Sequence, residues 1–244
     1  MKKLFVPYHF LFFLALFLAL FLAPGILLAK ARIVLDAGHG GTDSGVKAGS
    51  EVEKEWNLKF AQAIQRALEE EGYEVVQLRR GDTTLAEEKR AEMTNTAQAS
   101  AALIIHADRE WTGTLRGPYV VLEPPSKVEA GETNEIPKWG YISLAQYRSS
   151  LRLARAVAQR LGLGTDFSSL SDSRCLAGEV STSEGRIYGL PHESLRYLVV
   201  PSIVISPLFL SSAADLKKYS GTENLTEFAQ RVAKGTAEFL QSVP

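Results

Sequence analysis

Short apolar segments alternate with amphipathic segments along most of this chain, and that alternation constrains the fold more than any other feature. Segments rich in β-branched residues read as strands, at 31–38, 73–79, 101–107, 118–122 and 202–210. Segments with helical periodicity read as helices, at 53–72, 84–99, 142–162 and 224–243. In the first of these helices, Trp56, Phe60, Ile64 and Leu68 recur every four residues and make one apolar face. Strands alternating with helices predict an α/β fold, a single domain with a mostly parallel twisted sheet flanked by helices on both faces.

The first 31 residues differ from the rest of the chain. Two lysines precede an apolar run from Leu4 to Ala29, and small residues surround Lys30. This pattern predicts a secretory signal peptide that is cleaved after Ala31. An uncleaved membrane anchor is the alternative, because the apolar run is long enough to span a bilayer. In both cases we expect residues 32–244 to be exported to the periplasm or the extracellular space, and only an uncleaved N-terminal segment would link them to a membrane.

Composition limits the classes of partner and the means of stabilisation. The formal net charge is -1, and lysines and arginines are interspersed with acids, which does not favour nucleic-acid binding. Cys175 is the one cysteine, so the chain has no internal disulfide, and we interpret it as a spectator thiol. Prolines, glycines and acids between residues 123 and 140 predict a long loop, either a solvated surface loop or a flap beside a site.

Two of the four histidines occur in the same kind of position. His39 and His106 each follow an apolar strand, and the carboxyl ends of parallel strands lie at one edge of a sheet. Glycines at 38, 40 and 41 would let the backbone pass close to a bound ion. Two imidazoles brought together in this way make up half of a catalytic zinc site, which has three protein ligands and one open position. The alternative for each histidine alone is a strand-end residue with a satisfied hydrogen bond.

Three motifs extend this pattern. The stretches "IVLDAGHGGTDSG", "EKEWNL" and "ALIIHAD", at these spacings, resemble the zinc-dependent N-acetylmuramoyl-L-alanine amidases of the type 3 family. The resemblance implies hydrolysis of the amide between the muramic acid lactyl group and L-alanine in peptidoglycan. It also implies that His39, Glu53 and His106 bind Zn²⁺ and that peptidoglycan is the partner. Without the resemblance, Glu53 reads as a first-turn acid that the helix dipole favours.

Asp36 precedes His39 by three residues at the end of the same strand. We expect it to accept a hydrogen bond from a ligand imidazole, which would orient that ring. A solvated strand-end acid and a loop cap are the two alternatives.

The chain departs from the family at the last predicted strand. Ser206 stands where the family places a glutamate thought to handle protons, and serine is no general base near neutral pH without an activating partner. The catalytic group is therefore unassigned; His192 and Glu193 are possible substitutes, with loop or helix-cap roles as their alternatives. General acid–base assistance is typically worth about 10²–10⁴-fold in rate. The sequence thus supports two functions: an active zinc amidase, and a degenerate module that binds zinc and peptidoglycan or a partner without cleavage.

Overall fold

The computed structural model describes residues 30–109, 117–123, 144–163, 167–169, 187–189 and 192–242. The expected signal or anchor, Cys175 and nearly all of the expected loop at 123–140 lie outside these residues. Within the described part of the chain, no helix is both long and apolar enough to cross a membrane.

A seven-stranded sheet forms the centre of the domain, with strand order β4-β1-β5-β9-β6-β8-β7. Its strands are β1 (Arg32–Ala37), β4 (Glu74–Gln77), β5 (Ala101–Ile105), β6 (Tyr119–Leu122), β7 (Phe167–Ser169), β8 (Ile187–Gly189) and β9 (Ser202–Ser206). Every neighbouring pair is parallel except β6 and β9, so the prediction of a mostly parallel sheet is confirmed. The five expected strands all form. The sequence did not predict β7 and β8, which lie in a Ser- and Gly-rich region, or the hairpin β2 (Lys47–Ala48) and β3 (Glu51–Val52).

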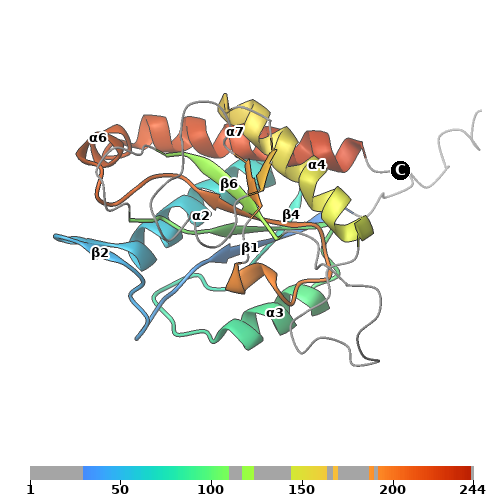
Figure 1. Ribbon diagram of the computed structural model, residues 1–244, viewed down its shortest axis with the longest axis horizontal. Coiled ribbons are helices and arrows are strands. Elements are labelled where there is room, and N and C mark those ends of the chain that lie inside the picture. Colours follow the sequence, from blue (N-terminus) through green and yellow to red (C-terminus); the bar gives the residue numbers. More distant parts are fainter. Residues whose placement is uncertain are drawn as a thin grey trace, which may run out of the picture. The chain divides into compact units, whose positions relative to one another are not determined.

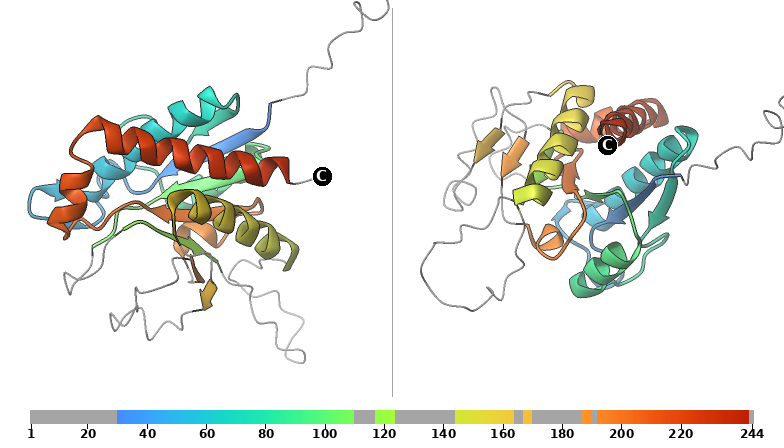
Figure 2. Two further views of the ribbon diagram at one scale, coloured as in Figure 1. Left: turned by 90° about the horizontal axis from the view of Figure 1, so that it is seen from above. Right: turned by 90° about the vertical axis from the view of Figure 1, so that its right-hand side faces the viewer.

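Helices cover both faces of the sheet (Figures 1 and 2). They are α2 (Glu53–Glu70), α3 (Glu87–Thr96), α4 (Leu144–Leu161), α6 (Ala213–Lys218) and α7 (Thr222–Gln241), with a short 3₁₀ helix η1 (Glu193–Leu195). The four helices expected from periodicity correspond to α2, α3, α4 and α7. Helices α2, α4 and α7 lie together on one face, while α3 and η1 lie on the other (Figure 1).

Successive side chains of each strand point to opposite faces of the sheet, and this alternation divides the core into two layers. Leu103 and Ile105 of β5 face the layer of α2, α4 and α7, whereas Ala102 and Ile104 face the layer of α3 and η1. Both layers are buried, which explains why β5 is apolar throughout. The parallel register of β1, β5 and β9 brings their carboxyl ends to one edge of the sheet, and the predicted site residues follow those ends.

Candidate metal centre

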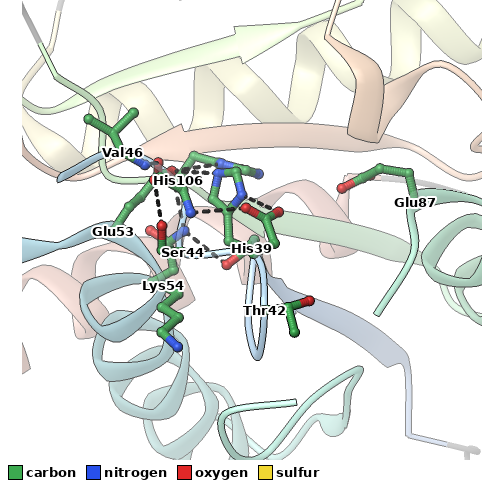
Figure 3. Close-up of polar contacts among 12 residues, drawn as sticks. His39, Thr42, Ser44, Val46, Glu53, Lys54, Glu87 and His106 are labelled. Atoms are coloured by element: carbon green, nitrogen blue, oxygen red, sulfur yellow. Dashed lines mark hydrogen bonds and ion pairs between the residues drawn. The ribbon is translucent and has the colours of Figure 1, made fainter. Parts of the chain in front are cut away.

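His39 lies in a sharp turn just after β1. Its backbone has φ 61°, in the left-handed region that a residue with a side chain seldom adopts. Arg90 of α3 donates a hydrogen bond to the His39 carbonyl oxygen at 2.6 Å, which fixes the turn from outside. Strained backbone of this kind persists where the surroundings hold it, commonly at functional sites. The turn directs the imidazole across the sheet edge toward α2 (Figure 3).

Glu53 is the first residue of α2 and is 2% exposed. Its Oε2 accepts a hydrogen bond from the Val46 backbone N–H at 2.9 Å, which fixes the carboxylate. The other oxygen, Oε1, lies 3.2 Å from His39 Nε2 and 2.9 Å from His106 Nδ1 (Figure 3). One oxygen therefore faces both imidazoles.

His106 follows β5 and is held beside β9, because its N–H donates to the Ile205 carbonyl at 3.2 Å. The centroid of its ring lies 4.8 Å from that of His39. Two glycines make room for the rings. A Cβ at Gly38 would lie 2.2 Å from His106 Nε2, and one at Gly45 would lie 2.5 Å from His39 Cδ2. Within the described residues, the buried His106 Nε2 has no hydrogen-bond partner.

The electrostatics of this group favour a positive charge between the ligands. Burial opposes protonation of His39, but hydrogen bonds and charges of Glu53 and Asp43 outweigh it and raise the His39 pKa to about 9. Burial likewise opposes ionisation of Glu53, but both histidines outweigh it and hold the Glu53 pKa well below its usual range. One ligand atom from each of His39, Glu53 and His106 lies within 4.8 Å of the others, so the group could hold a metal ion.

The carboxylate that contacts the His39 imidazole is Asp43, which is a correction to the expectation for Asp36. Asp43 Oδ2 lies 2.7 Å from His39 Nδ1. Asp36 is buried and accepts a hydrogen bond from Arg90 instead, so it is not a solvated strand-end acid either. Burial raises the Asp36 pKa, and the Arg90 charge opposes that rise. The sequence did not identify this pairing because Arg90 lies on α3, far along the chain.

A second buried arginine supports the loop that carries the ligands. Arg79 follows β4, and its guanidinium donates to the carbonyl oxygens of Ala37 at 2.7 Å, Gly38 at 3.0 Å and Lys54 at 2.7 Å. These carbonyls lie close in the chain to His39 and Glu53. Arg79 and Arg90 together connect the β1–α2 loop to the end of β4 and to α3.

Ser206, the last residue of β9, is fully buried; on one side, β9 pairs with β5, the strand that leads into His106. On its other side, Tyr119 of β6 is its antiparallel partner. The Tyr119 hydroxyl donates a hydrogen bond to the carboxylate of Asp108, two residues after His106. Burial raises the Asp108 pKa, while the Tyr119 hydroxyl opposes the rise and the Glu53 charge adds to it. A carboxylate therefore lies near the Ser206 position although β9 contributes none. The sequence signal for it was the Asp of "HAD".

The structure separates the two possible substitutes for the missing glutamate. The centroid of the His192 ring lies 5.1 Å from that of His106, so His192 reaches the centre. Burial and the His106 charge lower the His192 pKa to about 3. Glu193 is exposed at the first position of η1, and no hydrogen bond or ion pair among the described residues links it to the ligands.

Comparisons with known proteins point to one family of enzymes. A family model described as N-acetylmuramoyl-L-alanine amidase matches residues 33–238. The N-acetylmuramoyl-L-alanine amidase LytC of Bacillus subtilis is 25% identical over 207 residues, covering 85% of this chain and 35% of LytC. The probable cell wall amidase LytH of Staphylococcus aureus is 40% identical over 79 residues, covering 31% of this chain and 25% of LytH. The chain thus matches only about a third or less of the length of these relatives.

Solved structures share the fold. An N-acetylmuramoyl-L-alanine amidase from Clostridium difficile 630 has a TM-score of 0.65 at 22% identity, covering 88% of this chain and 99% of that chain. The apo form of Ami1 from Mycobacterium abscessus has a TM-score of 0.66 at 19% identity, covering 87% of this chain and 100% of that chain. The CwlD amidase of Clostridioides difficile, solved in complex with the GerS lipoprotein, has a TM-score of 0.64 at 18% identity over 87% of this chain and 99% of that chain.

Proposed function

The chain belongs to the N-acetylmuramoyl-L-alanine amidase family, whose model matches residues 33–238, and from that premise we propose that it is a zinc-dependent peptidoglycan amidase. The proposed reaction hydrolyses the amide between N-acetylmuramic acid and L-alanine. The observation that carries the proposal is the convergence of His39, Glu53 and His106 on one point at the sheet edge.

The donor set fits zinc, and its three atoms lie within 4.8 Å of one another. Ligand atoms at zinc bond lengths in a tetrahedral arrangement lie about 3.3 Å apart. The Glu53 Oε1 distances of 3.2 Å to His39 and 2.9 Å to His106 lie close to that value. Two imidazoles and one carboxylate leave one coordination position open, as catalytic zinc sites do. Zinc, when bound, would lower the pKa of a coordinated water and polarise the substrate carbonyl.

Proton transfer is the second requirement of amide hydrolysis, because a proton must leave the attacking water and reach the departing amine. We assign this transfer to Asp108. Its carboxylate lies beside the Ser206 position, and burial raises its pKa, which makes it a better proton carrier than an ordinary aspartate. His192, with a pKa near 3, is a weak base by comparison, and Tyr119 holds the Asp108 carboxylate in place.

Turnover by the purified full chain, kept in detergent because of its apolar N-terminal segment, tests the proposal. With zinc, it should release stem peptides with free L-alanine amines from peptidoglycan, and His106→Ala should abolish this. Asp108→Asn should lower kcat by about 10²–10⁴-fold with an unchanged zinc content. Glu193→Gln is the matched control, an exposed carboxylate that should have no effect. Zinc-loaded protein that releases no more amine than a metal-free sample would contradict the enzymatic function.

A module that binds zinc and peptidoglycan without cleaving is the second candidate, favoured by the buried Ser206 at the end of β9, where the family places a glutamate. It predicts stoichiometric zinc and sedimentation with insoluble peptidoglycan, but no released amine. Cleavage at rates typical of enzymes would exclude it.

Export of residues 32–244 is also part of the proposal, because peptidoglycan lies outside the cytoplasmic membrane. The apolar segment from Leu4 to Ala29 would direct that export, as a cleaved signal or an anchor. N-terminal sequencing of the protein recovered from the producing cell distinguishes the two: cleavage gives a new terminus at Arg32.

A further inference from the structure

The side chain of Asn57 is completely buried directly behind the proposed metal ligands. Asn57 lies four residues after Glu53 in α2, so the two side chains project from the same face of the helix. The motif "EKEWNL" contains both residues, but the proposed reaction gives a role only to the glutamate.

Asn57 contacts all three ligand-bearing segments with one amide group. Its Nδ2 donates to the carbonyl oxygen of Gly38, the residue before His39, at 3.1 Å, and to Glu53 Oε1 at 3.4 Å. Its Oδ1 accepts from the backbone N–H of Ala107, the residue after His106, at 2.6 Å. Asn57 therefore touches a ligand or the immediate neighbour of a ligand in each segment.

The partners fix the orientation of the amide. The Ala107 N–H can only donate and the Gly38 carbonyl can only accept, so a flipped amide would lose both bonds. Aspartate would keep the bond from Ala107 but lose both donations, and it would place a second carboxylate against Glu53. Alanine would remove the partner of the buried Ala107 N–H and one partner of the buried Glu53 carboxylate, and such losses cost stability.

We propose that Asn57 is a positioning residue of the metal centre, which sets the affinity and geometry of metal binding by holding Gly38, Glu53 and Ala107 in one arrangement without itself binding the ion. This inference rests on the proposed metal site. Removing a partner that orients metal ligands typically costs about 10–100-fold in metal affinity. The same range is expected for Asn57.

Competition with a chromophoric chelator measures zinc affinity in the full chain, and cobalt(II) absorption reports the ligand geometry. Asn57→Ala and Asn57→Asp should each weaken zinc binding by about 10–100-fold and alter the cobalt spectrum. Circular dichroism and thermal unfolding identify which variants fold; Asn57→Asp keeps the bond from Ala107 and provides the second variant.

Asn95→Ala is the matched control. Asn95 also bridges two segments through its amide, donating to the Tyr197 carbonyl at 2.8 Å and accepting from the Val199 N–H at 3.0 Å. It lies on α3, and its removal should lower the thermal stability but leave zinc affinity within about twofold. A role for Asn57 in folding alone would predict the same result for both asparagines.

The outcomes separate this inference from the proposed function. If wild-type protein binds zinc and the folded Asn57 variants bind it equally, with unchanged cobalt spectra, the positioning role is wrong while the metal centre stands. If wild-type protein binds no stoichiometric zinc, the metal centre is wrong, and the positioning role with it.

Discussion

His39 shows how much of this site depends on single residues. It adopts φ 61° without being glycine, and the strain is held by a hydrogen bond from Arg90 to its carbonyl and by Asp43 at its ring. Its neighbour Gly38 is required for a different reason. An added Cβ there would overlap the His106 ring, whereas the Gly38 backbone itself has no left-handed φ.

Gly38→Ala should therefore displace the His106 ring and weaken zinc binding by at least about tenfold, with a loss of stability of about 1–3 kcal/mol. Zinc titration and denaturant unfolding measure the two effects. Gly81→Ala is the control, because a Cβ at Gly81 meets nothing within 4 Å. Equal zinc affinity in the two variants would show that the ring has room to move without leaving the site.

The carboxylate near Ser206 gives a second prediction at this scale. Adding Ser206→Glu to the Asp108→Asn variant should raise its turnover at least about tenfold, since the new side chain supplies a carboxylate from the neighbouring strand end. Ser206→Glu alone should lower stability, because a second buried carboxylate would lie close to Asp108. Rates of amine release and denaturant midpoints check both statements. Restoration by Ser206→Gln as well would count against the need for a carboxylate.

Helix α2 is the element on which the site is built. Its first residue is Glu53, its fifth is Asn57, and its buried Phe60 packs edge-on against Tyr219 and Phe228, with ring centroids 5.0 and 5.2 Å away. Phe228 belongs to α7, which in turn crosses α4 closely at Gly235. The direction of α2, and with it the position of Glu53, thus depends on a layer of three helices.

Gly235→Ala tests the close crossing of α7 and α4. The added Cβ would lie 2.7 Å from Val157 Cα and 2.8 Å from the Ala156 carbonyl oxygen, both backbone atoms that cannot rotate away. The overlap should destabilise the protein by about 1–3 kcal/mol, despite the higher helix propensity of alanine. Denaturant unfolding measures the change. Lys234→Ala, at the exposed neighbouring position, should lie within about 0.5 kcal/mol of wild type.

At the scale of the whole molecule, the charges of the centre couple folding to pH and to metal. The His39 pKa is about 9 in the folded chain and about 6.5 in an unfolded one, so the folded state binds the extra proton between these values. This contribution to stability is complete below pH 6.5 and is lost as the pH rises through 9. The lowered Glu53 pKa affects stability in a different pH range: its contribution to folding stability is present above pH 4.5 and is lost at lower pH.

The metal-free protein should therefore lose stability between pH 6.5 and 9, by at most about 3 kcal/mol, while its zinc affinity rises by up to about tenfold per pH unit. The two trends are opposite because the metal must displace the His39 proton. Chemical unfolding in EDTA and zinc competition at several pH values measure them. A His39→Gln variant should lose most of the stability trend, and an unchanged trend would place the titrating group elsewhere.

Local pattern was enough to predict most of the fold. β-Branched runs and four-residue periodicity predicted five strands of the sheet, four helices and the parallel pairing that brings His39 and His106 to one edge. The hairpin β2–β3 and the strands β7 and β8 were missed, because two- and three-residue strands carry no periodicity to detect. The strand β6 itself was predicted, but its antiparallel pairing with β9 was not, since strand direction depends on the path of the connections rather than on the strand's own residues.

The sequence by itself predicted that His39 and His106 lie at one edge of the sheet, and its resemblance to the amidase family implied Glu53 as a third ligand and the departure at Ser206. Only the tertiary structure decided which groups support them. Asp43 rather than Asp36 meets the His39 ring, Asn57 joins three segments, and Asp108 reaches the position that β9 leaves without an acid. The physical reason is that such contacts depend on direction and on distances of about 3 Å between atoms far apart in the chain. Composition and periodicity contain no information on that scale.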